Sequence, residues 1–327
     1  MRAVIYEEYG DAEVLRQATL PRPSPSAGEI VVQVRAVEVT KSDTELRSLR
    51  FPVKWFAWLL RLFLGLRRPK RQVLGSYFSG VVTELGPGTS RFSKGDEVFG
   101  SSQLRMGAYG EYLVVPEAYT IAHKPRTASF EEAAAVPLGG LNALHFLRLA
   151  QVQRGQQILI NGGGGSIGSF AIQIARAMGA RVTVVDAPQK EAFVRSLGAE
   201  EFIDYSSEDF SRRSVVFDVV FDMVPGSDYS KCLGVLGPEG CYLSGNPTLW
   251  RMVQIIKTSI FSRRRASFAF ARESQAELEE LSRLLDAGKL RVMREVYALD
   301  NVVRAHQMVE SEQRTGLIVL SHQQTSA

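Results

Sequence analysis

A run of glycines between an apolar strand and an amphipathic helix is the feature that most limits what this chain can fold into. Residues 158–161 read Ile-Leu-Ile-Asn, residues 162–165 are all glycine, and residues 166–176 place apolar side chains at helical spacing. A second apolar, β-branched run follows at 181–185. A strand, a glycine turn, a helix and a second strand in this order predict a βαβ unit of a parallel sheet.

Three of the glycines, Gly163, Gly165 and Gly168, have the spacing G-x-G-x-x-G. In this motif the first glycine permits a tight turn and the second lets backbone N–H groups approach a pyrophosphate. The third lets the helix pack closely on the strand. The helix N-terminus, at Ser166 and Ile167, would direct its N–H groups and positive dipole end toward the phosphates. The segment is therefore predicted to bind a dinucleotide.

The residues after the second and third strands bear on which dinucleotide is bound. Asp186 ends the second strand, where a carboxylate accepts hydrogen bonds from the ribose hydroxyls of NAD and repels a 2′-phosphate. Lys190 and Tyr205 favour NADP, because both side chains could serve the 2′-phosphate, although Lys190 is equally well explained as a solvated helix residue. We expect NAD(H) or NADP(H), with a slight preference for NAD(H).

The chain divides into three parts that differ in their pattern of apolar and turn residues. Residues 1–120 are β-rich, with short β-branched runs separated by turn residues. In residues 121–262, helical stretches alternate with short apolar strands, at 157–160, 181–185, 201–204, 216–221 and 240–244. That alternation predicts a doubly wound parallel sheet, hence an α/β fold.

The tail, residues 263–327, is too small to form a domain alone. It contains an amphipathic helix at 274–287, a second helix at 300–311 and a terminal strand at 316–320. We expect it to pack back on the β-rich part and complete it.

Charge is concentrated in two segments of the chain. The net charge is +4, but residues 45–72 carry +7 and residues 251–272 carry +6, so the remainder carries −9. An acidic body with two basic inserts argues against nucleic-acid binding. The 45% of apolar residues exclude a disordered chain, and two cysteines cannot form a disulfide scaffold.

Neither a signal peptide nor a membrane-spanning segment is indicated. The N-terminus enters a strand pattern at once, and the apolar stretch 55–66 is interrupted by Arg61 and is too short to span a bilayer. A cytoplasmic location is expected.

The basic inserts each allow more than one interpretation. Residues 51–71 combine aromatic and basic side chains, as in a lid over a substrate site, a packed loop or a peripheral membrane contact. The arginines at 263–265 favour a solvated charge run, with a phosphate or partner contact as the alternative.

Several segments together resemble the medium-chain dehydrogenase/reductase superfamily, in its zinc-independent quinone oxidoreductase-like branch. Besides the glycine loop, they are residues 95–100, 133–143, 195–200, 203–205 and 316–320, in family order. The resemblance implies a GroES-like β-rich domain, a Rossmann domain and a cofactor cleft between them.

The resemblance also bears on zinc. Zinc-dependent members have a cysteine where this chain has Thr40, and a Gly-His-Glu segment where it has Gly75-Ser76-Tyr77. The loop after Gly100 lacks the four cysteines of the structural zinc site. Threonine and serine cannot replace thiolates and imidazoles at a stable zinc site, so no metal site is expected.

Without a metal, the chemistry left to such a protein is hydride delivery to an already polarised acceptor. The expected substrate is therefore a small apolar quinone or α,β-unsaturated carbonyl. Relatives carry Asn near Thr40 and Asp near Tyr77, so this chain departs from them twice. Tyr77 could donate a proton or fill the space of the metal site, and Thr40 could donate to a carbonyl or be a satisfied strand-end residue.

Further candidates come from the resemblance. Lys41 could approach the cofactor phosphates or lie at the surface, and Asn142 could orient the nicotinamide or cap a helix. Val224, Gly245 and Asn246 resemble the backbone segments that flank the adenosine and the nicotinamide.

Other chemical groups are expected to be structural. His145 is interpreted as a packed helix residue, and Cys232 and Cys241 as core or edge thiols.

The sequence thus predicts an NAD(P)H-dependent quinone or enone reductase, with a homodimer suggested by the family. Two alternatives stay open. One is a weakly catalytic dinucleotide-binding sensor or RNA- or partner-binding protein, and the other is a reductase of a lipid or carrier-bound substrate.

Overall fold

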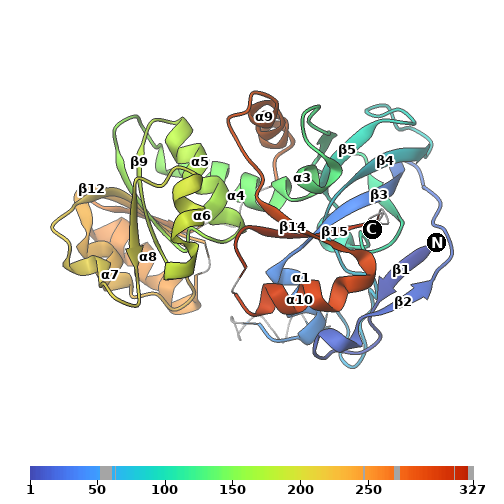
Figure 1. The fold of residues 1–327 in the computed structure, drawn as a ribbon, viewed down its shortest axis with the longest axis horizontal. Coiled ribbons are helices and arrows are strands. Elements are labelled where there is room, and N and C mark those ends of the chain that lie inside the picture. The colour runs from blue at the N-terminus through green and yellow to red at the C-terminus, as the bar shows by residue number, and fades with distance from the viewer. Residues whose placement is uncertain (52–60, 63, 246, 269–272, 313, 323–327) are drawn as a thin grey trace. The chain divides into compact units, whose positions relative to one another are not determined.

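A computed structural model describes residues 1–51, 61–62, 64–245, 247–268, 273–312 and 314–322. The chain forms two compact units (Figure 1). The first contains residues 1–137, 274–288 and 292–327, and the second contains residues 138–273 and 289–291. Among the described residues, no helix is both long and apolar enough to cross a membrane.

The first unit is built on a seven-stranded sheet in the order β14-β15-β3-β4-β5-β7, with β6 paired to β3, beside a two-stranded sheet of β1 and β2. Its strands are β1 (Arg2–Ile5), β2 (Arg16–Thr19), β3 (Glu29–Val39), β4 (Tyr77–Leu85), β5 (Glu97–Ser101), β6 (Tyr112–Pro116), β7 (Ile121–His123), β14 (Arg294–Ala298) and β15 (Leu317–Ser321). Its helices include α1 (Lys41–Ser48), α3 (Phe130–Ala134), α9 (Gln275–Asp286) and α10 (Val302–Glu310).

The longest strand, β3, organises this unit. Its valines and its one isoleucine are buried, and all of them except Val31 belong to one core cluster with residues of β4, β15 and α10. The C-terminal strand β15 runs antiparallel to β3, with Leu320 opposite Val37 (Figure 1). The tail of the chain therefore supplies strands to the sheet that the N-terminal part begins.

The second unit has a six-stranded sheet in the order β10-β9-β8-β11-β12-β13, and all its pairings are parallel. Its strands are β8 (Gln157–Asn161), β9 (Arg181–Asp186), β10 (Glu201–Asp204), β11 (Phe217–Asp222), β12 (Leu236–Ser244) and β13 (Arg265–Phe268). Helices α4 (Val136–Ala150), α5 (Ser166–Ala177), α6 (Glu191–Ser196), α7 (Tyr229–Gly234) and α8 (Leu249–Phe261) connect or flank them. This is the predicted doubly wound sheet, and its order changes direction at β8.

The boundaries between the units lie at other residues than the predicted 120/121 and 262/263. The first boundary comes later because β7 pairs with β5 and α3 packs on β3, so residues 121–137 belong to the β-rich unit. The second comes later because β13 pairs with β12, which keeps residues 263–273 with the parallel sheet.

Candidate functional site

The carboxyl ends of the parallel strands gather polar side chains at one edge of the second unit. Asn161 ends β8, Asp222 ends β11 and Ser244 ends β12, and all three are neighbours in register. Each is less than a tenth exposed. Ligands of doubly wound sheets bind at this edge, where the strand order changes direction.

The glycine loop joins β8 to α5 at this edge. Gly162 has φ +92°, a left-handed conformation that side chains rarely adopt, so Gly162 rather than Gly163 makes the turn. Gly163 instead packs against β9, because a Cβ there would lie 2.5 Å from a methyl group of Val184.

The other two motif glycines differ in what surrounds them. A Cβ at Gly168 would lie 2.5 Å from the carbonyl oxygen of Gly162, which is the close helix packing that the spacing predicts. Gly165 caps α5 in an extended conformation, and a Cβ there would meet nothing within 4 Å. Ser166 and Ile167 form the first turn of α5, as predicted. The backbone at Gly165 thus lies open at a helix N-terminus, which suits a pyrophosphate.

Asp186, at the end of β9, holds the glycine loop from the side. Its carboxylate accepts hydrogen bonds from the N–H groups of Gly164, at 2.6 Å, and Ala187, at 2.8 Å. The ammonium of Lys190 lies 3.4 Å from the same carboxylate, and the side chains are 13% and 8% exposed. Tyr205, which follows β10, is largely exposed.

Two of the three residues predicted to flank the cofactor are described. A Cβ at Gly162 would lie 3.2 Å from a methyl group of Val224, so the loop after β11 contacts the glycine loop. Gly245 follows β12 and donates its N–H to the carbonyl of Asp222 at 2.9 Å. Asn246 lies outside the described residues.

These residues fit a dinucleotide. The loop presents open backbone at Gly165, side chains are excluded at Gly163 and Gly168 by close packing, and a carboxylate and an ammonium adjoin the loop. The loop therefore has the geometry of the dinucleotide site that is typical of doubly wound folds.

In the first unit, Thr40 is a capping residue. It precedes α1, where its hydroxyl donates to Asp43 at 2.6 Å and accepts from the Asp43 N–H at 3.1 Å. Asp43 also accepts from the N–H groups of Thr40 and Gly75, and burial raises the pKa of its carboxyl. The expectation that Thr40 donates to a substrate carbonyl is not supported, because the hydroxyl proton is committed to Asp43.

Asp43 is a site residue that sequence reasoning missed. It ties the start of α1 to the segment that precedes β4, because it bonds both Thr40 and Gly75. The Thr-x-x-Asp spacing of a capping box was the signal that could have found it.

Tyr77 is the first residue of β4. It lies opposite Ser101 of β5 and is partly exposed. Lys41 forms an exposed ion pair with Glu312 at 2.5 Å, which matches its interpretation as a surface lysine. By the sequence resemblance, Thr40 and the segment Gly75-Ser76-Tyr77 correspond to the ligand-bearing segments of zinc-dependent members. Within the described ranges, no group of three or more His, Cys, Asp or Glu side chains could hold a metal ion. The donor set does not fit zinc.

Asn142 and His145 both lie on α4. The helix begins at Val136, so Asn142 is not in a turn and does not cap the helix. Its side-chain amide donates to the carbonyl of Leu138 at 2.8 Å, one turn back. His145 packs edge-on to Phe146 with ring centroids 5.8 Å apart.

The arginines at 263–265 are not a simple solvated run. Arg264 donates to the carbonyls of Leu236 and Gly237, and Arg265 donates to the carbonyl of Ala150 at the end of α4. The side chain of Arg263 is exposed. Two of these charges therefore serve the fold.

The other basic insert is only partly described, because residues 52–60 and 63 lie outside the described ranges. Leu64 is buried, and the carbonyl of Gly65 accepts a hydrogen bond from Tyr9 at 2.9 Å. Arg71 donates to the carbonyl of Arg105 at 2.7 Å. The C-terminal end of the insert is thus packed on the first unit, which agrees with the packed-loop interpretation there.

Both thiols are buried. Cys232 and Cys241 are less than a twentieth exposed, and burial raises the pKa of each. They are core residues, as expected, and neither thiol is activated.

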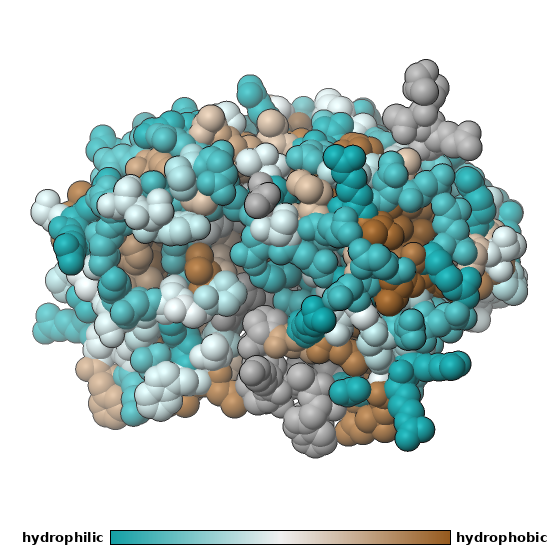
Figure 2. Space-filling model, turned by 60° about the horizontal axis from the view of Figure 1, so that its bottom comes forward, coloured by the Kyte–Doolittle hydropathy of each residue, from teal (hydrophilic) through white to brown (hydrophobic). Residues whose placement is uncertain are grey.

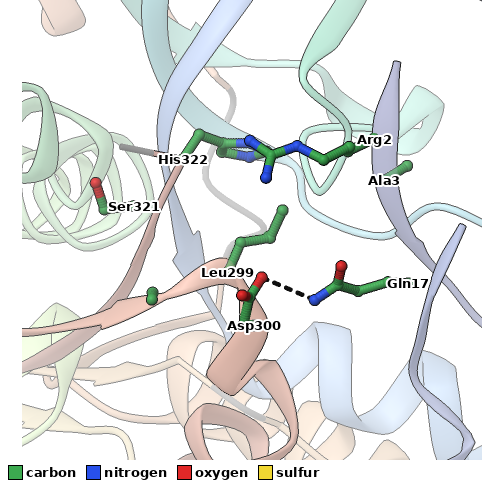
Figure 3. Close-up of a pocket in the computed structure, with 8 residues that line it drawn as sticks. Arg2, Ala3, Gln17, Leu299, Asp300, Ser321 and His322 are labelled. Carbon is green, nitrogen blue, oxygen red and sulfur yellow. Dashed lines mark hydrogen bonds between the residues drawn. The ribbon is translucent and has the colours of Figure 1, made fainter. Parts of the chain in front are cut away.

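A cavity within the first unit lies where the N-terminal strands meet the end of β15 (Figure 3). Its volume is about 40 Å³, enough for a few water molecules. Gln17 and Asp300 face each other across its rim and are joined by a hydrogen bond of 2.7 Å (Figure 3). The cavity is too small for a quinone or an enone.

Comparison with known proteins agrees with this architecture. The family described as "Alcohol dehydrogenase GroES-like domain" matches residues 26–126, and the family described as "Zinc-binding dehydrogenase" matches residues 197–320. A quinone oxidoreductase of Pseudomonas aeruginosa is 31% identical, over 98% of this chain and 99% of its own. A 2-methylene-furan-3-one reductase of Solanum lycopersicum is 28% identical over 98% of this chain and 79% of its own.

A solved structure extends the likeness to three dimensions. The quinone oxidoreductase from Coxiella burnetii is 31% identical, superposes with a TM-score of 0.86 and covers 99% of both chains. The chain is an oxidoreductase that belongs to the medium-chain dehydrogenase/reductase superfamily, in its quinone oxidoreductase-like branch.

Proposed function

We propose that this protein reduces a small apolar quinone or α,β-unsaturated carbonyl with NAD(P)H and without zinc. The observation that carries the proposal is the glycine loop, whose backbone at Gly165 lies open at the N-terminus of α5. The sequence resemblance adds that Thr40 and Tyr77 lie in the segments that carry the metal ligands in zinc-dependent members. One of the matched families is described as zinc-binding, but the described donor set here does not fit that ion. Relatives named as a quinone oxidoreductase and a furanone reductase support both acceptor classes.

When bound, the dinucleotide would supply a hydride for a carbon of the conjugated acceptor, whose negative charge would spread to oxygen. The chain's own groups bind and orient the reactants. The glycine loop and the N-terminus of α5 would hold the phosphates, and Asp186 holds the loop through the N–H of Gly164. A proton must then reach the substrate oxygen, and the phenol of Tyr77 is the proposed donor.

The test is steady-state oxidation of NADH and NADPH with a panel of quinones and enones, before and after dialysis against a chelator. We expect turnover that the chelator leaves unchanged. Tyr77→Phe should lower kcat with a quinone or an enone, whereas Tyr112→Phe, a partly exposed phenol on β6, should not. Turnover that depends on zinc would contradict the zinc-independent mechanism. Equal rates for wild type and Tyr77→Phe would contradict the role of Tyr77 as proton donor.

We further propose a preference for NADH over NADPH. Lys190 is already paired with Asp186, so the pair has no net positive charge to offer a 2′-phosphate, and the carboxylate repels one. The exposed Tyr205 adds a hydroxyl but no charge.

A second candidate is a dinucleotide-binding protein with little catalysis. The observation in its favour is that the side chains of Thr40 and Asn142 already form local hydrogen bonds. Thr40 donates to Asp43 in the first turn of α1, and Asn142 donates to the carbonyl of Leu138 within α4. Tight binding of NADH without turnover on any acceptor would support this candidate over the reductase.

We also propose a homodimer formed through the second unit. Figure 2 shows apolar side chains gathered at several places on an otherwise hydrophilic face. On α8, Trp250 is 66% exposed and Phe261 is 84% exposed, and α8 packs beside β13, which ends the sheet. A second copy would cover this apolar helix and pair with the strand edge. Light scattering should show a dimer that Phe261→Asp dissociates, and a monomeric wild type would refute this proposal.

A further inference from the structure

The carboxylate of Asp222 is the most heavily bonded polar group at the carboxyl edge of the parallel sheet. It is 2% exposed and lies at the end of β11. One oxygen accepts from the amide of Asn161 at 2.9 Å and from the N–H of Val224 at 3.2 Å. The other accepts from the hydroxyls of Tyr242, at 2.7 Å, and Ser227. Strands β8, β11 and β12 and the loop after β11 thus meet at one carboxylate.

Arg251 supplies the cation for this carboxylate from the first turn of α8. Its side chain is 13% exposed, and one guanidinium nitrogen lies 3.4 Å from Asp222. The same nitrogen donates to the Tyr242 hydroxyl at 2.6 Å, and the other terminal nitrogen donates to the carbonyl of Ser227. The guanidinium also lies 5.1 Å from the ring centroid of Tyr229.

This arrangement fastens the loop of residues 223–228 at both ends. Asp222 holds the N–H of Val224 near the start of the loop, and Arg251 holds the carbonyl of Ser227 near its end. Between these points the chain turns through Gly226, whose φ is +79°. The Val224 side chain, which is 41% exposed, borders the first residue of the glycine loop, because a Cβ on Gly162 would lie 3.2 Å from one of its methyl groups. The loop that carries Val224 is therefore held at one end by Asp222 and at the other by the guanidinium of Arg251.

We propose that Asp222 and Arg251 are a positioning pair, which holds Val224 against the glycine loop and so sets the affinity for the dinucleotide. The inference rests on the proposed cofactor site and deepens it. Neither side chain needs to touch the cofactor, because the pair acts through the backbone of the 223–228 loop. Without the guanidinium, the Ser227 carbonyl loses a donor and a buried carboxylate loses its cation, so the loop relaxes.

The experiment compares Arg251→Met with Arg251→Lys and with the control Lys257→Met, an exposed cation on the same helix. The dissociation constant for NADH is measured by calorimetry, and kcat is measured at saturating NADH. We expect Arg251→Met to raise the dissociation constant about tenfold. Arg251→Lys should show a smaller rise, since it keeps the charge but loses the second donor. The dissociation constant of the Lys257→Met control should stay near that of wild type. The kcat of every variant at saturating NADH should also stay near that of wild type.

Hydrogen exchange of the free protein gives a readout that needs no cofactor. In Arg251→Met the Val224 amide should exchange faster, while the amides of β8 and β9 keep their protection. A wild-type dissociation constant and wild-type exchange at Val224 would overturn the proposal. If Arg251→Met does not fold, Tyr242→Phe tests the same contact, since that hydroxyl bridges Arg251 and Asp222.

The two proposals fail in different ways. If wild type binds neither NADH nor NADPH, the proposed cofactor function fails, and the exchange of Val224 still tests the pair. If wild type binds NADH and Arg251→Met binds it equally well with Val224 still protected, the positioning pair alone fails.

Discussion

Alanine substitutions at Gly165 and Gly168 should separate the two duties of the glycine loop, which are folding and binding. At Gly168 a Cβ would lie 2.5 Å from the Gly162 carbonyl oxygen and 2.6 Å from the Gly163 Cα. Carbon–oxygen contacts are normally about 3.3 Å or longer, so the backbone must move by most of an ångström. At Gly165 the Cβ would meet nothing within 4 Å, and φ of −90° is available to alanine.

The magnitudes follow from these surroundings. Overpacking against backbone costs about 2–3 kcal/mol, so Gly168→Ala should lower Tm by about 5–10 °C. Gly165→Ala loses only the capping preference of glycine over alanine, about 0.5–1 kcal/mol. If the pyrophosphate lies over Gly165, however, the new methyl group occupies its space. A penalty of about 1.4–3 kcal/mol then raises the dissociation constant for NADH roughly 10- to 150-fold.

The assay pairs calorimetric unfolding of the free protein with titration of NADH. Gly165→Ala should have nearly the wild-type Tm but a much smaller rise in Tm when NADH is added, because that rise reports binding to the native state. Wild-type affinity in Gly165→Ala would refute the placement of the pyrophosphate. An unchanged Tm in Gly168→Ala would refute the close-packing argument.

Three further predictions concern single side chains. Asp186→Ser should free Lys190 for a 2′-phosphate and raise kcat/KM for NADPH relative to NADH about tenfold, and the same kinetics in Asp186→Ser and wild type would contradict the preference argument. Thr40→Ala should cost about 1–2 kcal/mol in urea unfolding by removing the cap and a partner of Asp43, whereas Thr40→Ser should be nearly neutral. Burial lowers the pKa of His306 from 6.5 to about 3, so below pH 6.5 the unfolded chain takes up a proton that the native protein does not. Stability should therefore fall between pH 6.5 and pH 3, and His306→Gln should flatten that dependence in a pH series of urea unfolding, with an equally steep dependence counting against the assignment.

Much of the second unit could be predicted because its signals are local. Strands β8 and β9 are short apolar runs that end at turn residues, and they extend only one residue past the runs at 157–160 and 181–185. The glycine motif also needs no distant partner, since its turn, its open backbone and its close packing lie within a few residues. The one detail that the motif misplaced is the turn itself, which falls at Gly162.

Helix boundaries were harder, and Asn142 shows the reason. Residues 139–143 contain two glycines, which favour a turn in the sequence, yet they lie inside α4. A Cβ at Gly139 would lie 2.6 Å from the ring of Phe170 and 2.7 Å from the Ser166 carbonyl, so α4 requires a glycine there to approach α5. The glycine serves tertiary packing rather than a turn, and only the neighbouring helix reveals that.

The interpretation of the arginines in residues 251–272 as a basic insert was incomplete for a related reason. Counting charges along the chain treats Arg251, Arg264 and Arg265 as members of one basic insert. In the structure Arg251 is paired with Asp222, which lies 29 residues earlier, and the other two donate to backbone carbonyls. Because each partner is distant in sequence, no spacing rule could have found it. A site made of contiguous backbone can be identified from sequence, whereas the side chains that hold such a site in position become visible only once the strands are paired. The charge pattern of the sequence assigns Arg251 to a basic insert, whereas the structure pairs it with Asp222. Its substitution therefore tests the structure rather than the glycine motif.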